Sequence, residues 1–207
     1  MTATGHEMTD VILKRRSVRR FDPGRQVSRE DWWKVLEAAV RAPSAHNSQP
    51  WRFIVLENPK SKRLLIDTLS ESFITDLQAE GVAQARIKEL VAASRERLSG
   101  APVLILAAMK EVPPPKKVAI VREIHEAVMA TQSLAAAVEN LLVAATALGL
   151  GSCWVSAPLY CQDQIRKAFG LDETLHPQAL IMLGHPAPAA DPTKRFQAPV
   201  EASVEFR

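Results

Sequence analysis

The sequence predicts a single α+β domain with four apolar strands. Four apolar runs long enough for strands lie scattered among helical segments and are not collected in one part of the chain. The 207 residues are enough for one well-buried domain, and no internal repeat or low-complexity linker divides them. We therefore expect one domain over residues 1–207.

The first helix is predicted from Ser28 to Pro43, because both ends carry recognisable signals. Ser28 is a good N-cap, and Glu30 and Asp31 favour the positive end of a helix. The apolar face of the helix comprises Trp32, Val35, Leu36, Ala39 and Val40. After a short polar turn, the bulky, β-branched segment 51–57 (WRFIVLE) predicts a buried strand.

The middle of the chain predicts helix, then strand, then loop. Residues 60–98 are polar and strongly helical in composition, and no proline interrupts them. Segment 101–109 (APVLILAAM) is continuously apolar, which predicts a strand covered on both faces. Residues 111–117 (EVPPPKK) are expected to form a loop.

A long helix is predicted from about Arg122 to Leu148, with Gly149 as its C-terminal cap. Its second half is apolar nearly all round, so it should be buried in a core or between subunits. The remaining elements follow in order along the chain. They are a strand at 152–157, a short helix at 162–169 ending at Gly170, a strand at 177–186 and an extended tail at 191–207.

Several features favour a soluble cytoplasmic protein. Glu139 interrupts the longest apolar helical run, so no membrane-spanning segment is expected. The first ten residues lack the apolar core of a signal peptide. Two cysteines without a paired framework indicate a reducing compartment.

The net charge of +3 is unevenly distributed. Segment 14–21 (KRRSVRRF) places five cationic side chains in eight residues, and the rest of the chain is slightly acidic. A nucleic-acid binder more often carries basic residues along a whole face, and a solvated surface is the other ordinary explanation. The local charge favours one small, highly charged anion.

Other candidate sites receive little support from the sequence. The five histidines and two cysteines show no zinc-like spacing, so no metal site is expected. Cys153 is expected to fill space in a strand, and the position of Cys161 near a helix start would lower its pKa. Segment 149–154 (GLGSCW) follows a helix and precedes a strand, the reverse of a dinucleotide-binding fingerprint. Its glycines would permit the close approach of something flat.

Segment 43–51 (PSAHNSQPW) gathers hydrogen-bonding side chains between a helix and a buried strand. It is either an ordinary polar turn or a loop that presents these groups to a polar heterocycle. Together with segments 15–22 (RRSVRRFD), 140–155 (NLLVAATALGLGSCWV) and a basic tail, it resembles the FMN-dependent nitroreductase family over essentially the whole chain. Segments 76–81, 95–106 and 127–142 most resemble the nitroreductase-type domain fused to the glutamate ligase of deazaflavin-coenzyme biosynthesis. A ligase domain is not expected within these residues.

The resemblance implies a nitroreductase-like fold, with a mainly antiparallel sheet flanked by helices, in an intertwined homodimer that binds FMN. Arg15, Arg16 and Ser17 would contact the phosphate and ribityl oxygens, and Arg19 would lie near N1 and O2 of the flavin. Lys194 and Arg195 would complete the phosphate site. Guanidinium groups suit a phosphate because they make paired charge-assisted hydrogen bonds.

The resemblance also assigns residues around the flavin ring. One loop would reach the flavin from the other subunit; it comprises Pro43, Ser44, Ala45 and Asn47. Gln132 or Ser133 would add a polar contact. A strand would pass beside the ring, with the backbone N–H of its third or fourth member near N5; it comprises Trp154, Val155, Ser156 and Ala157. Many relatives carry an acidic residue and a glycine at the last two positions, so this chain departs from that pattern.

The implied activity is a ping-pong oxidoreductase reaction without a catalytic side chain. NADH or NADPH would pass hydride to flavin N5, and a conjugated acceptor would then take the electrons. The acceptor is either a nitroarene or quinone, or the unsaturated deazaflavin precursor, whose phosphorylated tail Lys116 and Lys117 would attract. A non-catalytic flavin-binding protein is the alternative, and neither nucleic acid nor a membrane is an expected partner.

Overall fold

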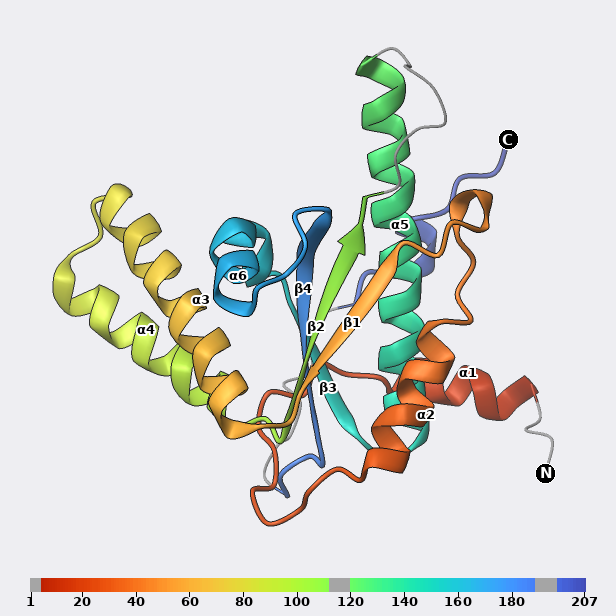
Figure 1. Cartoon of the computed structure of the whole chain (residues 1–207). Helices are drawn as coiled ribbons and strands as arrows, with labels where there is room; N and C mark the ends of the chain where they lie inside the picture. Colours follow the sequence, from red (N-terminus) through yellow and green to blue (C-terminus); the bar gives the residue numbers. More distant parts are fainter. Residues whose placement is uncertain (1–4, 112–119, 189–196) are drawn as a thin grey trace.

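A computed structural model describes residues 5–111, 120–188 and 197–207, and a four-stranded sheet lies at its centre (Figure 1). The strands occur in the order β1-β2-β4-β3, and every neighbouring pair is antiparallel. The predicted α+β class with an antiparallel sheet is therefore confirmed. The strands are β1 (Trp51–Leu56), β2 (Val103–Lys110), β3 (Gly151–Val155) and β4 (Leu175–Gly184).

Helices cover both faces of this sheet. In Figure 1, α3, α4 and α6 lie on one side of the strands and α1, α2 and α5 on the other. The helices are α1 (Gly5–Lys14), α2 (Arg29–Ala39), α3 (Pro59–Ala79), α4 (Gln84–Ser99), α5 (Ile120–Ala147) and α6 (Gln162–Phe169). Short 3-10 turns are η1 (Ala45–Asn47), η2 (Ala157–Tyr160) and η3 (Val200–Ala202), the last of which interrupts the expected extended tail.

Strand β2 shows why two cores form. Its side chains alternate between the sheet faces, so Ile105 joins the core beneath α2 and α5. Leu104 and Leu106 join the core beneath α3 and α6. All three side chains are fully buried, as the continuous apolar sequence predicted.

Helix α2 begins as expected but ends early. The Ser28 hydroxyl accepts a hydrogen bond from the Asp31 N–H at 3.0 Å, which confirms the predicted cap. The helix ends at Ala39 and not at Pro43, because Arg41 and the next residue bond three residues back and tighten the last turn. Val40 consequently lies outside the apolar face and is 45% exposed.

The region predicted as one helical stretch is a hairpin of two helices. Gly81, with φ of 75°, allows the chain to reverse between α3 and α4. Leu77, Ile87 and Val91 form a small apolar cluster of their own between these helices. Of the expected loop at 111–117, all but the first residue lies outside the described residues.

Helix α5 is the long helix that the sequence predicted. In its second half, Leu134, Val138 and Leu141 are buried against the sheet and α2. The expectation that no segment is apolar and long enough to cross a membrane was wrong, because residues 122–147 meet both conditions. Since the second half packs in the core, α5 is a core helix of this fold.

The two glycines predicted to end helices do so. Gly149 after α5 has φ of 71°, and Gly170 after α6 has φ of 59°. Left-handed backbone of this kind favours glycine, because it lacks a Cβ. The cap at Gly149 turns the chain directly into β3.

Candidate functional site

The basic segment, residues 14–21, is held at both ends against the sheet. It leaves α1 and runs beside β3, where the Val18 N–H donates to the Ser152 carbonyl at 2.8 Å. At its other end, Phe21 bridges to Pro186. The arginines between these contacts are therefore carried on a fixed backbone.

Two glycines permit this close approach. A Cβ at Gly151 would lie 2.7 Å from Val18 Cγ1, and a Cβ at Gly184 would lie 2.7 Å from Phe21 Cδ1. These distances are shorter than carbon atoms tolerate. Val18 of the basic segment thus takes the space that Gly151 leaves, whereas a Cβ at Gly149 would meet no atom within 4 Å.

Most arginine side chains of the segment form no ion pair with a carboxylate of the described residues. Arg15 pairs with Glu139 on α5, with Nε 3.2 Å from Oε1. Arg16 is exposed and donates to the Leu13 carbonyl at 2.6 Å. Arg19 donates to the Ser17 carbonyl at 3.3 Å. Among the arginines of the segment, only Arg15 pairs with a carboxylate in the part of the chain that the structure describes.

The polar loop, residues 43–50, is fastened to α5. The Ala45 N–H donates to the Ser133 hydroxyl at 3.1 Å, and that hydroxyl donates to the Met129 carbonyl at 2.7 Å. Within the loop, the Gln49 N–H donates to the Ser44 hydroxyl at 3.0 Å. The Ser133 hydroxyl is thus already engaged by the loop.

The same loop contains strained backbone. His46, Asn47 and Gln49 have φ of 55°, 52° and 46°. Left-handed backbone at residues other than glycine is uncommon, and it concentrates at functional sites. A loop held in this conformation by its surroundings is suited to presenting side chains in fixed positions.

We expect Ser133→Ala to lower the free energy of unfolding by about 1–2 kcal/mol, because the Ala45 N–H would lose its acceptor. Urea denaturation at one fixed protein concentration measures the change. Ser99→Ala is the control, since the Ser99 hydroxyl only donates to an exposed carbonyl of its own helix. Equal losses in the two variants would contradict a special role for Ser133.

The strand predicted to pass the flavin ends sooner than expected. Trp154 is 37% exposed and Val155 is half-buried, but Ser156 and Ala157 lie outside β3. Pro158 has no N–H for a strand ladder, and the Ser156 carbonyl instead accepts from the Leu159 N–H at 3.1 Å in η2. The N–H groups of Ser156 and Ala157 lie at the start of η2, where a helical turn offers no acceptor of its own.

A cavity of about 150 Å³ lies between α3, α4 and η2. Val155 and Ala157 form part of its wall, so it borders the segment predicted to lie near the flavin. Asp76 is the one charged residue among the described residues that line the cavity. Its negative charge would repel a phosphate, so the cavity does not suit the phosphate of a cofactor. Cys161 also lines it; burial raises the pKa of this thiol, so the expected lowering was wrong.

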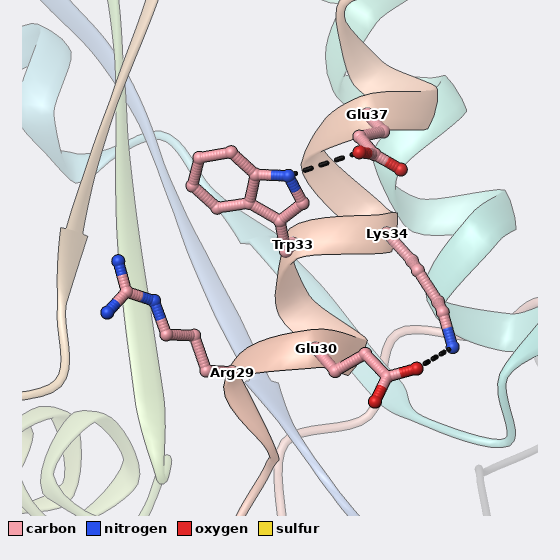
Figure 2. Close-up of a pocket in the computed structure, with 5 residues that line it drawn as sticks. All are labelled: Arg29, Glu30, Trp33, Lys34 and Glu37. Carbon is pink, nitrogen blue, oxygen red and sulfur yellow. Dashed lines mark hydrogen bonds and ion pairs between the residues drawn. The ribbon is translucent and has the colours of Figure 1, made fainter.

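A second hollow, of about 390 Å³, lies on the surface of α2 (Figure 2). Two of its charged groups pair with each other: the Lys34 ammonium lies 2.7 Å from a Glu30 oxygen. Trp33 Nε1 donates to Glu37 at 3.1 Å. None of the residues predicted to bind the cofactor lines this hollow, and we do not assign the functional site to it.

The predicted site residues fall into two groups in one chain. The basic segment lies beside β3, and the polar loop lies against α5 near the exposed Gln132. No hydrogen bond or ion pair joins the two groups within the described ranges. Lys194 and Arg195 lie outside those ranges. Glu139 is not among the residues predicted from the sequence, although it is the sole charged residue between 128 and 147.

Comparison with known proteins agrees with the fold. The model of the nitroreductase family matches residues 12–185. A protein of Archaeoglobus fulgidus, whose name gives NADH dehydrogenase and NAD(P)H nitroreductase as alternatives, is 30% identical over 89% of this chain and 88% of its own.

Two solved structures are also similar. A BluB-like flavoprotein from Clostridium difficile 630 is 29% identical, with a TM-score of 0.81 over 98% of this chain and 100% of that one. A structure described as a nitroreductase in complex with FMN, from Desulfovibrio desulfuricans, is 26% identical, with a TM-score of 0.71 over 100% of this chain and 98% of that one. Because the family model spans most of the sequence, this chain belongs to the nitroreductase family.

Proposed function

We propose that this protein is an FMN-dependent oxidoreductase that takes electrons from NADH or NADPH and passes them to a conjugated acceptor. The observation that carries the proposal is the basic segment, fixed against β3 with most of its guanidinium charge unpaired. The similar Desulfovibrio structure contains FMN, and the Archaeoglobus relative is named for NAD(P)H. Both support this cofactor and this reductant.

The residues present fit FMN. Its terminal phosphate carries about two negative charges, and guanidinium forks bind such a group in pairs. Ser152 Oγ is buried beneath the basic segment and has no hydrogen-bond partner among the described residues. An unpaired buried hydroxyl of this kind is costly in isolation, and a ligand or a water that binds with it would relieve the cost.

Each part of the chain then has a role toward the bound cofactor. FMN, when bound, supplies the two-electron chemistry, while the protein binds and orients it. Arg15, Arg16 and Ser17 would hold the phosphate and ribityl oxygens, together with Lys194 and Arg195. The charge of Arg19 would favour negative charge at the N1 and O2 edge. Trp154 and Val155 would face the ring, and the backbone N–H of Ser156 or Ala157 would serve N5.

The proposed active form is a homodimer in which each polar loop serves the flavin site of the other subunit. Apolar side chains support a second copy as the partner. Met8 and Leu13 on α1 are 56% and 64% exposed, and Ile124 and Val128 on α5 are 56% and 47% exposed. Patches of this kind commonly mark protein interfaces.

Sedimentation at low protein concentration is expected to show a dimer that retains FMN. Because each loop would complete the flavin site of the other subunit, any dilution that separates the subunits should also release FMN. A stable monomer that keeps its FMN would contradict the shared site.

Two acceptor classes remain within the proposal. The name of the Archaeoglobus relative favours a nitroarene. The sequence likeness of the middle segments favours a large, anionic acceptor of the deazaflavin-precursor type, which we propose as the better substrate. Steady-state specificity constants for both acceptors, with the same reduced protein, decide between them. A higher constant for the nitroarene, with the precursor inert, would replace our choice by a general nitroreductase.

The primary experiment is the cofactor itself. The purified protein is expected to be yellow and to release FMN, not FAD, on heating, as identified by mass. NADH and NADPH should each be tested for bleaching of the flavin absorbance under anaerobic conditions. A colourless protein that takes up no added FMN would overturn the proposed function, whereas bound FMN without turnover would leave a flavin-binding protein.

We also propose a cytoplasmic location, because the sequence contains only two cysteines and no pattern of a disulfide framework. Cell fractionation tests it, and recovery of the protein with the membrane fraction would contradict it.

A further inference from the structure

Glu139 is an unusual residue for its position. It is the single charged side chain between residues 128 and 147, in the half of α5 that packs in the core. Its neighbours Val138 and Leu141 are fully buried, but the Glu139 side chain is 50% exposed and faces the start of the basic segment. Its ion-pair partner among the described residues is Arg15.

The geometry of this pair is specific. Arg15 uses Nε, which lies 3.2 Å from Glu139 Oε1. A guanidinium group has five N–H donors in a planar fork, so an ion pair at Nε leaves the two terminal nitrogens for another acceptor. The Arg15 side chain is 30% exposed, so these terminal donors are held at a partly solvated surface.

Holding the fork in place has a consequence for binding. A long arginine side chain loses conformational freedom when it grips a ligand, and an arginine that is already ordered loses less. Arg15 lies two residues before Ser17, which bridges to β3, so its backbone is also restrained. Both ends of the side chain are therefore fixed before any anion arrives.

We propose that Glu139 is a positioning residue that orients Arg15 toward the phosphate of FMN. This proposal rests on the proposed function. The carboxylate acts through Arg15 and does not touch the cofactor. The carboxylate and the phosphate are both negative and repel each other, so Glu139 contributes by orienting Arg15 and not by attracting the phosphate.

Two substitutions separate orientation from charge. Glu139→Gln keeps an oxygen that accepts from Arg15 Nε and removes the negative charge, so the Kd for FMN is expected to stay within about twofold of the parent. Glu139→Leu suits the apolar helix but removes the acceptor, and it is expected to raise that Kd about 5- to 10-fold, which lies within the range that one ordinary hydrogen bond contributes.

Riboflavin, which lacks the phosphate, is the control. If Glu139 only maintained the fold, its loss would weaken riboflavin binding as much as FMN binding. Fluorescence titrations of the full-length protein, depleted of cofactor, measure the Kd for FMN and for riboflavin in each variant. We expect Glu139→Leu to weaken FMN binding and leave riboflavin binding unchanged. In an Arg15→Ala background, Glu139→Leu should have no further effect, since the residue through which it acts is gone.

Several results would overturn the proposal. Equal weakening of FMN and riboflavin would show that Glu139 only maintains the fold, and additive losses in the double variant would separate it from Arg15. Unchanged FMN binding in Glu139→Leu would remove any role, and tighter binding would make Glu139 a competitor of the phosphate. Should Glu139→Leu not fold, Glu139→Ala takes its place. A parent protein that binds neither FMN nor riboflavin would instead refute the proposed function.

Discussion

Replacing Arg15 with alanine is expected to raise the Kd for FMN about 10- to 140-fold. One charge-assisted hydrogen bond to the phosphate contributes about 1.5–3 kcal/mol. The fold should tolerate the change, because Glu139 is half exposed and water replaces its lost partner. Fluorescence titration measures the affinity, and thermal unfolding without cofactor verifies the fold.

Arg86→Ala is the matched control for this experiment. Arg86 also pairs with a carboxylate, that of Glu89 at 2.7 Å, and it lies on α4, outside the predicted site. The substitution removes the same charge, so general electrostatic attraction changes equally. We expect the Kd for FMN to stay within about twofold of the parent. If both variants weakened FMN binding alike, Arg15 would have no local role.

Gly151→Ala is expected to displace the basic segment from β3. The new Cβ would lie 2.7 Å from Val18 Cγ1 and 2.8 Å from Val18 Cβ, so the segment must move. Overpacking of this kind costs about 1–3 kcal/mol of stability. Because the segment carries Arg15 and Arg19, we expect the Kd for FMN to rise at least about tenfold, as one good hydrogen bond to the phosphate is lost.

Two controls separate displacement from simple destabilisation. Gly149→Ala strains a left-handed residue in the same turn, but its Cβ would meet no atom within 4 Å. It should lower stability and leave FMN affinity unchanged. In a Val18→Gly background, which removes the obstructing side chain, Gly151→Ala should weaken FMN binding less. A full effect in that background would contradict the steric explanation.

The elements that the sequence predicted well are those with local signals. Ser28 caps α2, Gly170 ends α6, and the apolar run around Leu104 forms a strand buried on both faces. The boundaries that failed depend on weaker or competing signals. Gly81 alone divides α3 from α4, and Pro158 converts the end of the third strand into a turn.

The chemistry of the site was easier to predict from the sequence than its geometry. Runs of arginine and polar residues can be recognised directly in the sequence, and the family resemblance implies their roles. Contacts between residues distant in the sequence are not visible in this way. The pairs Val18–Gly151 and Ala45–Ser133 form only when the sheet and α5 are assembled. In the sequence Glu139 is only a break in an apolar run, since its partner Arg15 lies outside α5.

The basic segment has a second consequence, for association between copies of the protein. Strand β3 is the last strand of the sheet, and an outer strand with unpaired N–H and C=O groups is a template for aggregation. Here the Ser152 carbonyl already accepts a hydrogen bond from the Val18 N–H, and the basic segment runs beside the strand. A variant that releases the segment would uncover this strand, so it should form oligomers joined strand to strand even in the absence of cofactor. The segment proposed to hold a phosphate is thus also expected to keep the sheet from extending into a neighbouring molecule.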